Sequence, residues 1–152
     1  MAGNVFAQTP LDTLVNKLNS DAELEEKLKE IQIAANWLIL NNPDTMVYYG
    51  NYALKMIDTY KKPDKDKLFF LGILSETHFN LSNYSEALKY AFESLRISEQ
   101  VGDSLEMANN HNSIGSIYRV SSKLDEAEEH FFAGLDLRMK LNDSLGIASS
   151  YN

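Results

Sequence analysis

The chain has 152 residues, of which 44% are hydrophobic, and this length and composition suffice for one domain with a buried core. Its net charge of -8 argues against nucleic acid and anionic membrane surfaces as partners, because the chain has no basic stripe to offset the repulsion. The absence of cysteine excludes disulfides, thiolate nucleophiles and cysteine-ligated zinc, and no apolar run is long enough to span a bilayer.

The first eight residues show no helical pattern. Val5 and Ala7 lie at the spacing of the two small residues that precede a signal-peptide cleavage site. We therefore expect residues 1–8 to be a disordered tail, the remnant of an export signal or a remnant of cloning. The export interpretation predicts a periplasmic or otherwise exported protein, and a cytoplasmic location is the alternative.

Two helices are predicted before the clearest internal repeats. Thr9 and Pro10 predict the start of a short helix, and Ser20 with Glu23 predicts the start of a longer one that extends to Leu40. Each pattern places apolar residues on one helical face. These residues are Leu11, Leu14, Val15 and Leu18 in the short helix, and Leu24, Leu28, Ile31, Ala35 and Leu38 in the long one.

A repeat of 40 residues is the strongest pattern in the sequence. The segment YSEALKYAFESL, which begins at Tyr84, returns as LDEAEEHFFAGL from Leu124. The segment DSLEMANN, which begins at Asp103, has a counterpart, DSLGIASS, that begins at Asp143. A weaker copy of the first segment begins at Pro43. The chain thus holds about three copies and the start of a fourth. We expect residues 9–152 to form a single repeat domain that is truncated in the fourth copy.

Each copy contains two helical patterns. In the third copy, Asp103 with Glu106 predicts the start of a helix that ends near Val120, and a second helix is predicted from about residue 123 to residue 141. Helices often end at a residue in the left-handed conformation, which glycine and asparagine adopt most readily. Gly102 and Asn142 occupy this position in two successive copies.

These residues resemble the tetratricopeptide repeat family, in its form with repeats of about forty residues. Ala87 and Ala127 match the small residue where the two helices of a repeat cross, and Gly115 and Tyr118 match positions of the first helix. The resemblance covers residues 29–152, and the phrase DSLGIASSYN resembles repeat arrays of bacterial signalling proteins. It implies an all-α fold, a right-handed α-α superhelix of helical hairpins. A leucine in place of Ala127 is expected to overpack the crossing.

The resemblance also implies a site, because the first helices of such repeats line a concave surface that binds a peptide or another protein. Gly72 and Glu76 stand where one specialised group of the family has Lys and Asn to clamp a carboxylate, so we do not expect that ligand. A solvated surface that binds nothing is the alternative. The positions carried over onto this chain are Phe69, Ile73, Glu76, Phe79, Asn80, Asn109, Asn112, Ser113, Ser116 and Arg119.

No arrangement of residues typical of a catalytic site is found. His78 and His111 fall on repeat positions normally held by aromatic residues, and His130 replaces Tyr90 of the preceding copy. This pattern favours packing or surface roles for the three histidines over metal binding. We expect no metal, no cofactor and no enzymatic activity of this chain itself.

Two classes of function follow from these observations. In the first, the chain is the sensory or docking domain of a larger bacterial signalling protein, a sensor kinase or a transcription regulator. In the second, it is a free-standing cytoplasmic scaffold or peptide-responsive regulator. In either class the expected partner is a protein or peptide. The truncated fourth copy would leave an apolar C-terminal face, through which the chain could also self-associate.

Overall fold

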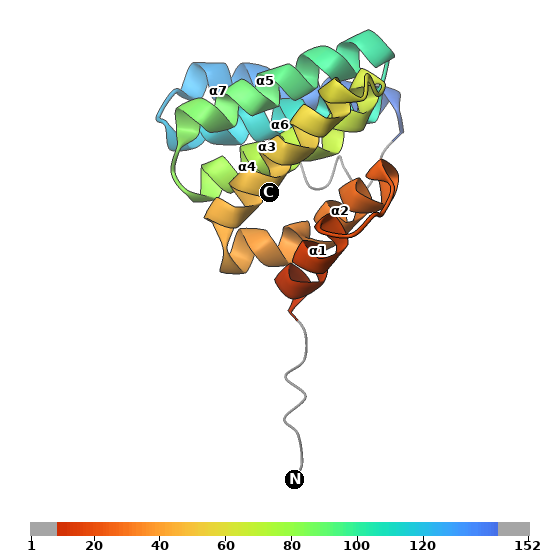
Figure 1. The fold of residues 1–152 in the computed structure, drawn as a ribbon. Coiled ribbons are helices and arrows are strands. Elements are labelled where there is room, and N and C mark those ends of the chain that lie inside the picture. The colour runs from red at the N-terminus through yellow and green to blue at the C-terminus, as the bar shows by residue number, and fades with distance from the viewer. Residues whose placement is uncertain (1–8, 143–152) are drawn as a thin grey trace.

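The structure is a computed structural model that describes residues 9–142, and every regular element in that range is a helix (Figure 1). The all-α class predicted from the sequence is thus confirmed. Six of the seven α-helices form three consecutive pairs, and α1 precedes them. The helices are α1 Pro10–Leu18, α2 Leu24–Asn41, α3 Pro43–Thr59, α4 Leu68–Asn80, α5 Tyr84–Val101, α6 Ser104–Val120 and α7 Leu124–Lys140, with a short 3-10 helix, η1 Asp64–Lys67.

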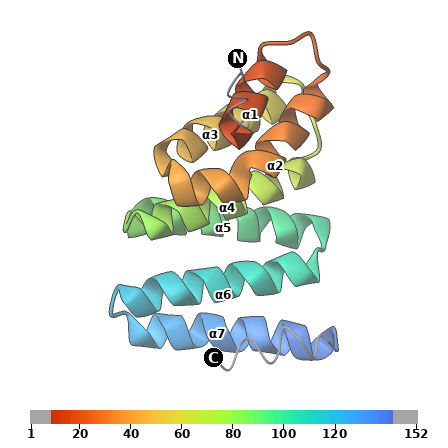
Figure 2. The ribbon, with the colours of Figure 1, turned by 90° about the horizontal axis from the view of Figure 1, so that it is seen from below.

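The helices pack in the order in which they follow one another in the chain. Each helix contacts its neighbour, so that α2 and α3, α4 and α5, and α6 and α7 form antiparallel hairpins; α5 and α6 join the last two hairpins (Figure 2). The first helices of successive hairpins also contact each other, α2 with α4 and α4 with α6, and the second helices do so less. First helices therefore lie closer together, as expected if they form the inner side of a curved stack.

The helix starts only partly follow the sequence-based expectation. Thr9 caps α1 as predicted, in a reciprocal arrangement with Asp12 in which each side chain bonds the other residue's backbone N–H. Ser20 does not cap α2: its hydroxyl donates to the Lys17 carbonyl oxygen and accepts from the Ala22 N–H, and α2 begins later, at Leu24. The prediction was wrong because this serine closes the end of α1 instead. On the predicted apolar faces, Leu14 and Ile31 are buried, whereas the side chain of Val15 is exposed. Leu40, the predicted end of the long helix, is also exposed.

Left-handed residues recur with the period of the repeat. Gly102 and Asn142 have positive φ angles of 73° and 53°, which confirms the predicted helix ends, and Lys61 occupies the same place one copy earlier with a φ of 51°. A second set, Ser82 and Ser122, lies 40 positions apart after α4 and α6, each with a φ of 60°. The repeat is therefore present in the backbone conformation as well as in the residues.

The repeat positions with small residues are tightly packed. Ala87 is fully buried and Ala127 nearly so. A Cβ atom on Gly115 would lie 2.8 Å from the Phe131 ring of α7, closer than carbon atoms approach without a shift. These positions need short side chains because the paired helices are packed against them.

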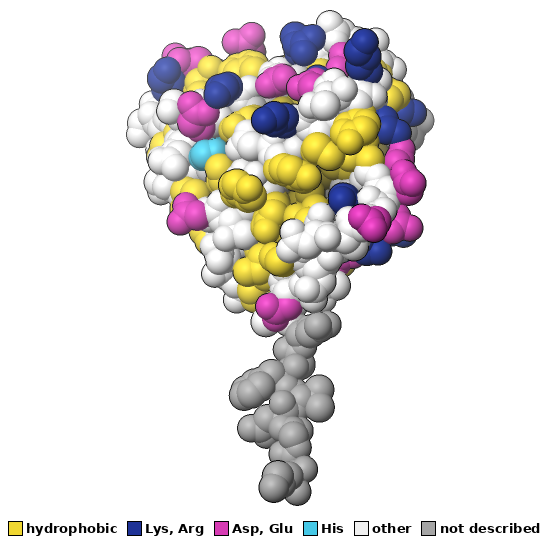
Figure 3. Space-filling view, viewed as in Figure 1, with side chains coloured by type: hydrophobic (Ala, Val, Ile, Leu, Met, Phe, Trp, Pro, Cys, Tyr) yellow, Lys and Arg dark blue, Asp and Glu magenta, His cyan; other side chains and the backbone are white. Residues whose placement is uncertain are grey.

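Several large apolar side chains remain on the surface. Figure 3 shows hydrophobic side chains across much of one face, with charged side chains mostly toward the rim. On α7, Leu124, Phe132 and Met139 are all exposed, and the exposed fraction of Phe132 is 61%. The last described helix thus carries exposed apolar residues. The start of the fourth copy lies outside the described residues, and self-association stays a prediction.

Candidate functional site

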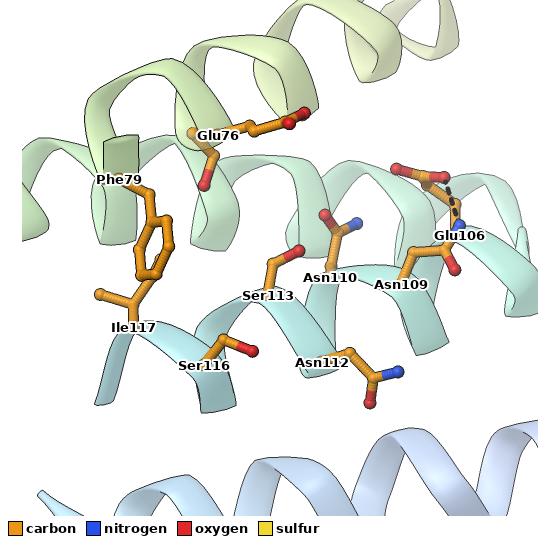
Figure 4. A pocket seen from close by; sticks show the side chains of 11 residues that line it. Glu76, Phe79, Glu106, Asn109, Asn110, Asn112, Ser113, Ser116 and Ile117 are labelled. Atoms are coloured by element: carbon orange, nitrogen blue, oxygen red, sulfur yellow. Dashed lines mark hydrogen bonds between the residues drawn. The ribbon is translucent and has the colours of Figure 1, made fainter. Parts of the chain in front are cut away.

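A pocket of about 400 Å³ opens between the first helices of the second and third hairpins, α4 and α6 (Figure 4). Eight of its eleven lining residues have polar side chains, and an aromatic ring and an aliphatic side chain lie at one end, although more of the exposed wall surface is apolar than polar. Among residues 9–142, no basic side chain lines it. The lining residues are Gly72, Ser75, Glu76 and Phe79 of α4, and Glu106, Asn109, Asn110, Asn112, Ser113, Ser116 and Ile117 of α6.

The structure brings together most of the predicted groove positions. Six of the ten line the pocket: Glu76, Phe79, Asn109, Asn112, Ser113 and Ser116.

The other four predicted positions lie elsewhere. Ile73 is only 9% exposed and belongs to the core cluster of the N-terminal helices, so the prediction that it faces the groove was wrong. Phe69 is exposed and packs edge-on against Phe70, and Asn80 is an exposed residue at the end of α4. Arg119 borders a second, smaller hollow of about 210 Å³ beside α7.

The predicted set missed five of the lining residues: Gly72, Ser75, Glu106, Asn110 and Ile117. Helical periodicity in the sequence could have identified some of them. Gly72 and Ser75 lie four and one positions before Glu76, on one helical face with Phe79.

Both walls of the pocket are hydrogen-bonded to α5, which lies behind it. The Ser75 hydroxyl of α4 donates to the Ala87 carbonyl oxygen at 3.0 Å. The Asn110 amide of α6 donates to the Ser98 hydroxyl at 3.4 Å, and Ser98 in turn donates to the Leu95 carbonyl oxygen. Since Ser75, Ser98 and Asn110 are all buried, these bonds fix the floor of the pocket and satisfy polar groups that would be costly to bury alone.

A chain of polar side chains positions the far end of the pocket. Arg138 of α7 donates to the Asn109 amide oxygen at 2.7 Å, and the Asn109 amide nitrogen donates to the Glu106 carboxylate at 3.3 Å (dashed in Figure 4). Burial raises the pKa of the Glu106 carboxyl, and the nearby Asp103 charge raises it further, whereas the hydrogen bond from Asn109 lowers it. Desolvation of the carboxylate is the largest of these effects.

Not every lining side chain points into the pocket. Figure 4 shows Asn112 directed toward α7, away from α4. Its amide oxygen is buried and accepts no hydrogen bond among the described residues; it lies 2.7 Å from where a Cβ atom on Gly134 would stand. Asn112 is therefore better placed to pack against α7 than to bind a ligand.

Within residues 9–142, no three His, Cys, Asp or Glu side chains are grouped so that they could hold a metal ion. Two of the histidines nevertheless meet, which the sequence did not predict. The Nδ1 atoms of His111 on α6 and His130 on α7 lie 3.0 Å apart. His78 is separate from this pair and stacks on Tyr90 at a centroid distance of 5.5 Å.

The histidine pair predicts a pH-dependent stability. Burial lowers the pKa of both His111 and His130, the charge of His130 lowers that of His111 further, and Glu129, together with Glu99 for His111, opposes these effects. The unfolded chain then binds protons at higher pH than the folded pair, so the pair's contribution is complete above about pH 6.5 and is lost as the pH falls below that value.

We expect thermal unfolding to show a lower Tm at about pH 5.5 than at about pH 7.5. His130→Tyr, which restores the residue that stands at Tyr90 in the preceding copy, is the matched control and should reduce this difference. An equal pH dependence in the native chain and the variant would contradict the assignment to the histidine pair.

A comparison with protein-family models and with curated proteins finds no match to this chain. The resemblance to the tetratricopeptide repeat therefore remains a prediction based on the residues quoted above. Among the described residues, no helix combines the length and apolar character needed to cross a membrane.

Proposed function

We propose that the chain is a repeat module that binds a peptide or a segment of another protein in the pocket between α4 and α6. One observation carries this proposal: six positions chosen from the repeat alignment as groove-lining meet in one open pocket, on the first helices of neighbouring hairpins. First helices contact each other here, as expected for the inner side of a curved stack of hairpins.

The chemistry of the pocket suits an extended chain segment. Amides such as Asn109 and Asn110 offer both donors and acceptors, which peptide backbones require, and hydroxyls such as Ser113 can do either. Phe79 and Ile117 provide an apolar end against which a side chain can pack (Figure 4). A volume of about 400 Å³ lies within the range of small-ligand sites, so the pocket can take one or two side chains.

Selection from a random peptide library, followed by calorimetric titration of the peptides obtained, tests the proposal directly. The variant Gly72→Leu should abolish or strongly weaken their binding, because it fills the pocket from the α4 side. A Cβ atom on Gly72 would have no other atom within 4 Å, so the Cβ atom of the new side chain causes no clash. Leucine is also the better helix former, and the Tm should not fall.

The matched control is Gly72→Ala, which adds one methyl group and leaves the pocket open. This variant should bind the selected peptides nearly as well as the native chain and gain about 0.5–1 kcal/mol in unfolding free energy, because glycine is unfavourable within a helix. Unchanged peptide affinity in Gly72→Leu would show that the pocket is not the binding site.

We further propose that this module is the sensory or docking part of a larger bacterial signalling protein, such as a sensor kinase or a transcription regulator. The support is the resemblance of DSLGIASSYN to such repeat arrays. A free-standing cytoplasmic scaffold is the second candidate. The reading frame on both sides of this sequence decides between them: an upstream export signal with a downstream kinase-like or DNA-binding region supports the first, and a short frame without them supports the second.

A further inference from the structure

The contact between His111 and His130 joins the two helices of the third hairpin. Their Nδ1 atoms lie 3.0 Å apart, so that one nitrogen donates a hydrogen bond and the other accepts it. When both rings are protonated, each Nδ1 carries a hydrogen, and two N–H groups and two positive charges face each other. The contact between α6 and α7 at this point therefore requires at least one neutral ring.

The groups around the pair offset this repulsion only in part. Glu129 of α7 favours the charged form of both rings, and Glu99 of α5 favours that of the ring on α6. The rings of Phe92 on α5 and Tyr118 on α6 pack against His130 at centroid distances of 5.8 Å and 5.7 Å and add no charge. Burial lowers the pKa of both histidines by more than the carboxylates raise it, so both are neutral at about pH 7.5.

The preceding hairpin shows how the same positions pack without a histidine pair. Leu71 of α4 lies 40 positions before His111, and Tyr90 of α5 lies 40 positions before His130. Leu71 and Tyr90 belong to one buried cluster, so a hairpin of this kind does not need histidines at these positions. The chain has only three histidines, and the third, His78, stacks on Tyr90. The third hairpin is therefore the only one that can carry such a pair.

The same side of α7 also holds one wall of the α4–α6 pocket. His130, Gly134 and Arg138 follow at intervals of four residues, which places them on one side of the helix. Arg138 donates to the amide oxygen of Asn109, a lining residue of the pocket, at 2.7 Å. Between these two contacts the helices are tightly packed, because a Cβ atom on Gly134 would lie 3.2 Å from the Ala108 carbonyl oxygen. Since α7 is one continuous helix, its movement away from α6 at the histidine pair also moves Arg138 away from Asn109.

We propose that the His111–His130 pair makes the α4–α6 pocket responsive to pH, so that a peptide bound at neutral pH is released on acidification. Double protonation separates α7 from α6, Arg138 loses its hydrogen bond to Asn109, and this wall of the pocket loses its fixed arrangement. By reciprocity, a bound peptide favours the neutral pair. This inference rests on the proposed function, since it describes the regulation of the same site.

The first test needs no peptide. The isotope-labelled chain is titrated from about pH 8 to about pH 5 and followed by NMR. The ring signals of His111 and His130 and the side-chain amide signals of Asn109 should change with a common midpoint below about pH 6.5. In His111→Leu with His130→Tyr, which installs the residues of the second hairpin, the Asn109 signals should no longer show this transition. Glu106→Gln controls for the carboxylate that Asn109 also bonds, and should keep it.

The second test measures affinity. A library peptide that binds the native chain and is blocked by Gly72→Leu is titrated at about pH 7.5 and at about pH 5.5. The native chain should bind it at least about fivefold more weakly at the lower pH, the lower end of the usual range for coupled sites. The double variant should bind it nearly equally at both pH values. Each single substitution, His111→Leu or His130→Tyr, should act in the same way, because either one removes the pair.

Asn109 signals that do not change through the histidine transition, or that change equally in the double variant, would overturn the inference. The same holds if peptide affinity depends on pH equally in the native chain and the double variant, or if the helical circular dichroism is lost at about pH 5.5, since the chain would then unfold as a whole. A failure of the proposed function differs: Gly72→Leu would leave peptide binding intact, and the first test would still decide whether the pair controls the pocket wall.

Discussion

Leu74→Ala is expected to lower the free energy of unfolding by about 2–5 kcal/mol, as for other leucines truncated in a well-packed core. Leu74 of α4 is fully buried, in a cluster with Leu71, Tyr90 and Ile97. The helix around it is apolar on most sides because α4 contacts α2, α3, α5 and α6. A cavity at this point is thus enclosed by several helices, and the surroundings can collapse into it only in part.

The contact between Leu74 and Gly50 of α3 allows a second test of this prediction. A Cβ atom on Gly50 would lie 2.8 Å from a terminal methyl carbon of Leu74, so Gly50→Ala should destabilise the native chain. Leu74→Ala removes that methyl group. In the Leu74→Ala background we therefore expect Gly50→Ala to become stabilising, by up to about 1 kcal/mol, because alanine favours the helix and fills part of the cavity.

Urea unfolding of the four proteins in this cycle measures the coupling. The sign of the Gly50→Ala effect must reverse between the two backgrounds. If the two substitutions add without coupling, α3 and α4 do not pack as closely as the structure places them.

Ala87→Leu is the second substitution with a large expected effect. Ala87 of α5 is fully buried, and its carbonyl oxygen accepts the Ser75 hydroxyl of α4. Three extra carbon atoms must push α4 and α5 apart or adopt a strained rotamer, so the free energy of unfolding should fall by about 1–3 kcal/mol.

The equivalent substitution one copy later, Ala127→Leu, provides the comparison. Ala127 borders the open hollow beside Phe131 and Phe132, where part of a leucine side chain can fit. We therefore expect Ala127→Leu to lower the free energy of unfolding by less than Ala87→Leu does. Thermal unfolding of both variants measures the difference; a larger loss at position 127 would mean that the hollow is filled in solution.

The helices were largely predictable because the repeat gives each signal twice. The cap at Asp103 and the left-handed ends at Gly102 and Asn142 agree with the pattern, and α6 ends at Val120 as expected. The left-handed Ser82 and Ser122 were not predictable in the same way. Serine has little preference for that conformation, which here belongs to the turn that follows α4 and α6.

The residues that line the pocket were predicted in part, and the positions that were predicted wrongly have a physical explanation. Positions carried over from a repeat alignment assume that each first helix has a free inner face. In α4 that face is shared, because α2 and α3 also pack on it, and Ile73 is buried against them. Glu106 was missed because it was interpreted only as part of a helix start, whereas its side chain bonds Asn109 at the pocket. Such a position depends on how two hairpins meet, which local sequence does not specify.

The two hydrogen bonds that tie the pocket to α5 have a mechanical consequence. Ser75 joins α4 to α5 within one hairpin, and Asn110 joins α6 to the same helix from the next hairpin. The width of the pocket is therefore set by the angle between adjacent hairpins. A ligand that contacted both walls, as proposed above, would favour one bend of the stack, and by reciprocity bending the stack would change the affinity for that ligand. Ligand binding in the pocket and bending of the helical stack would then be coupled.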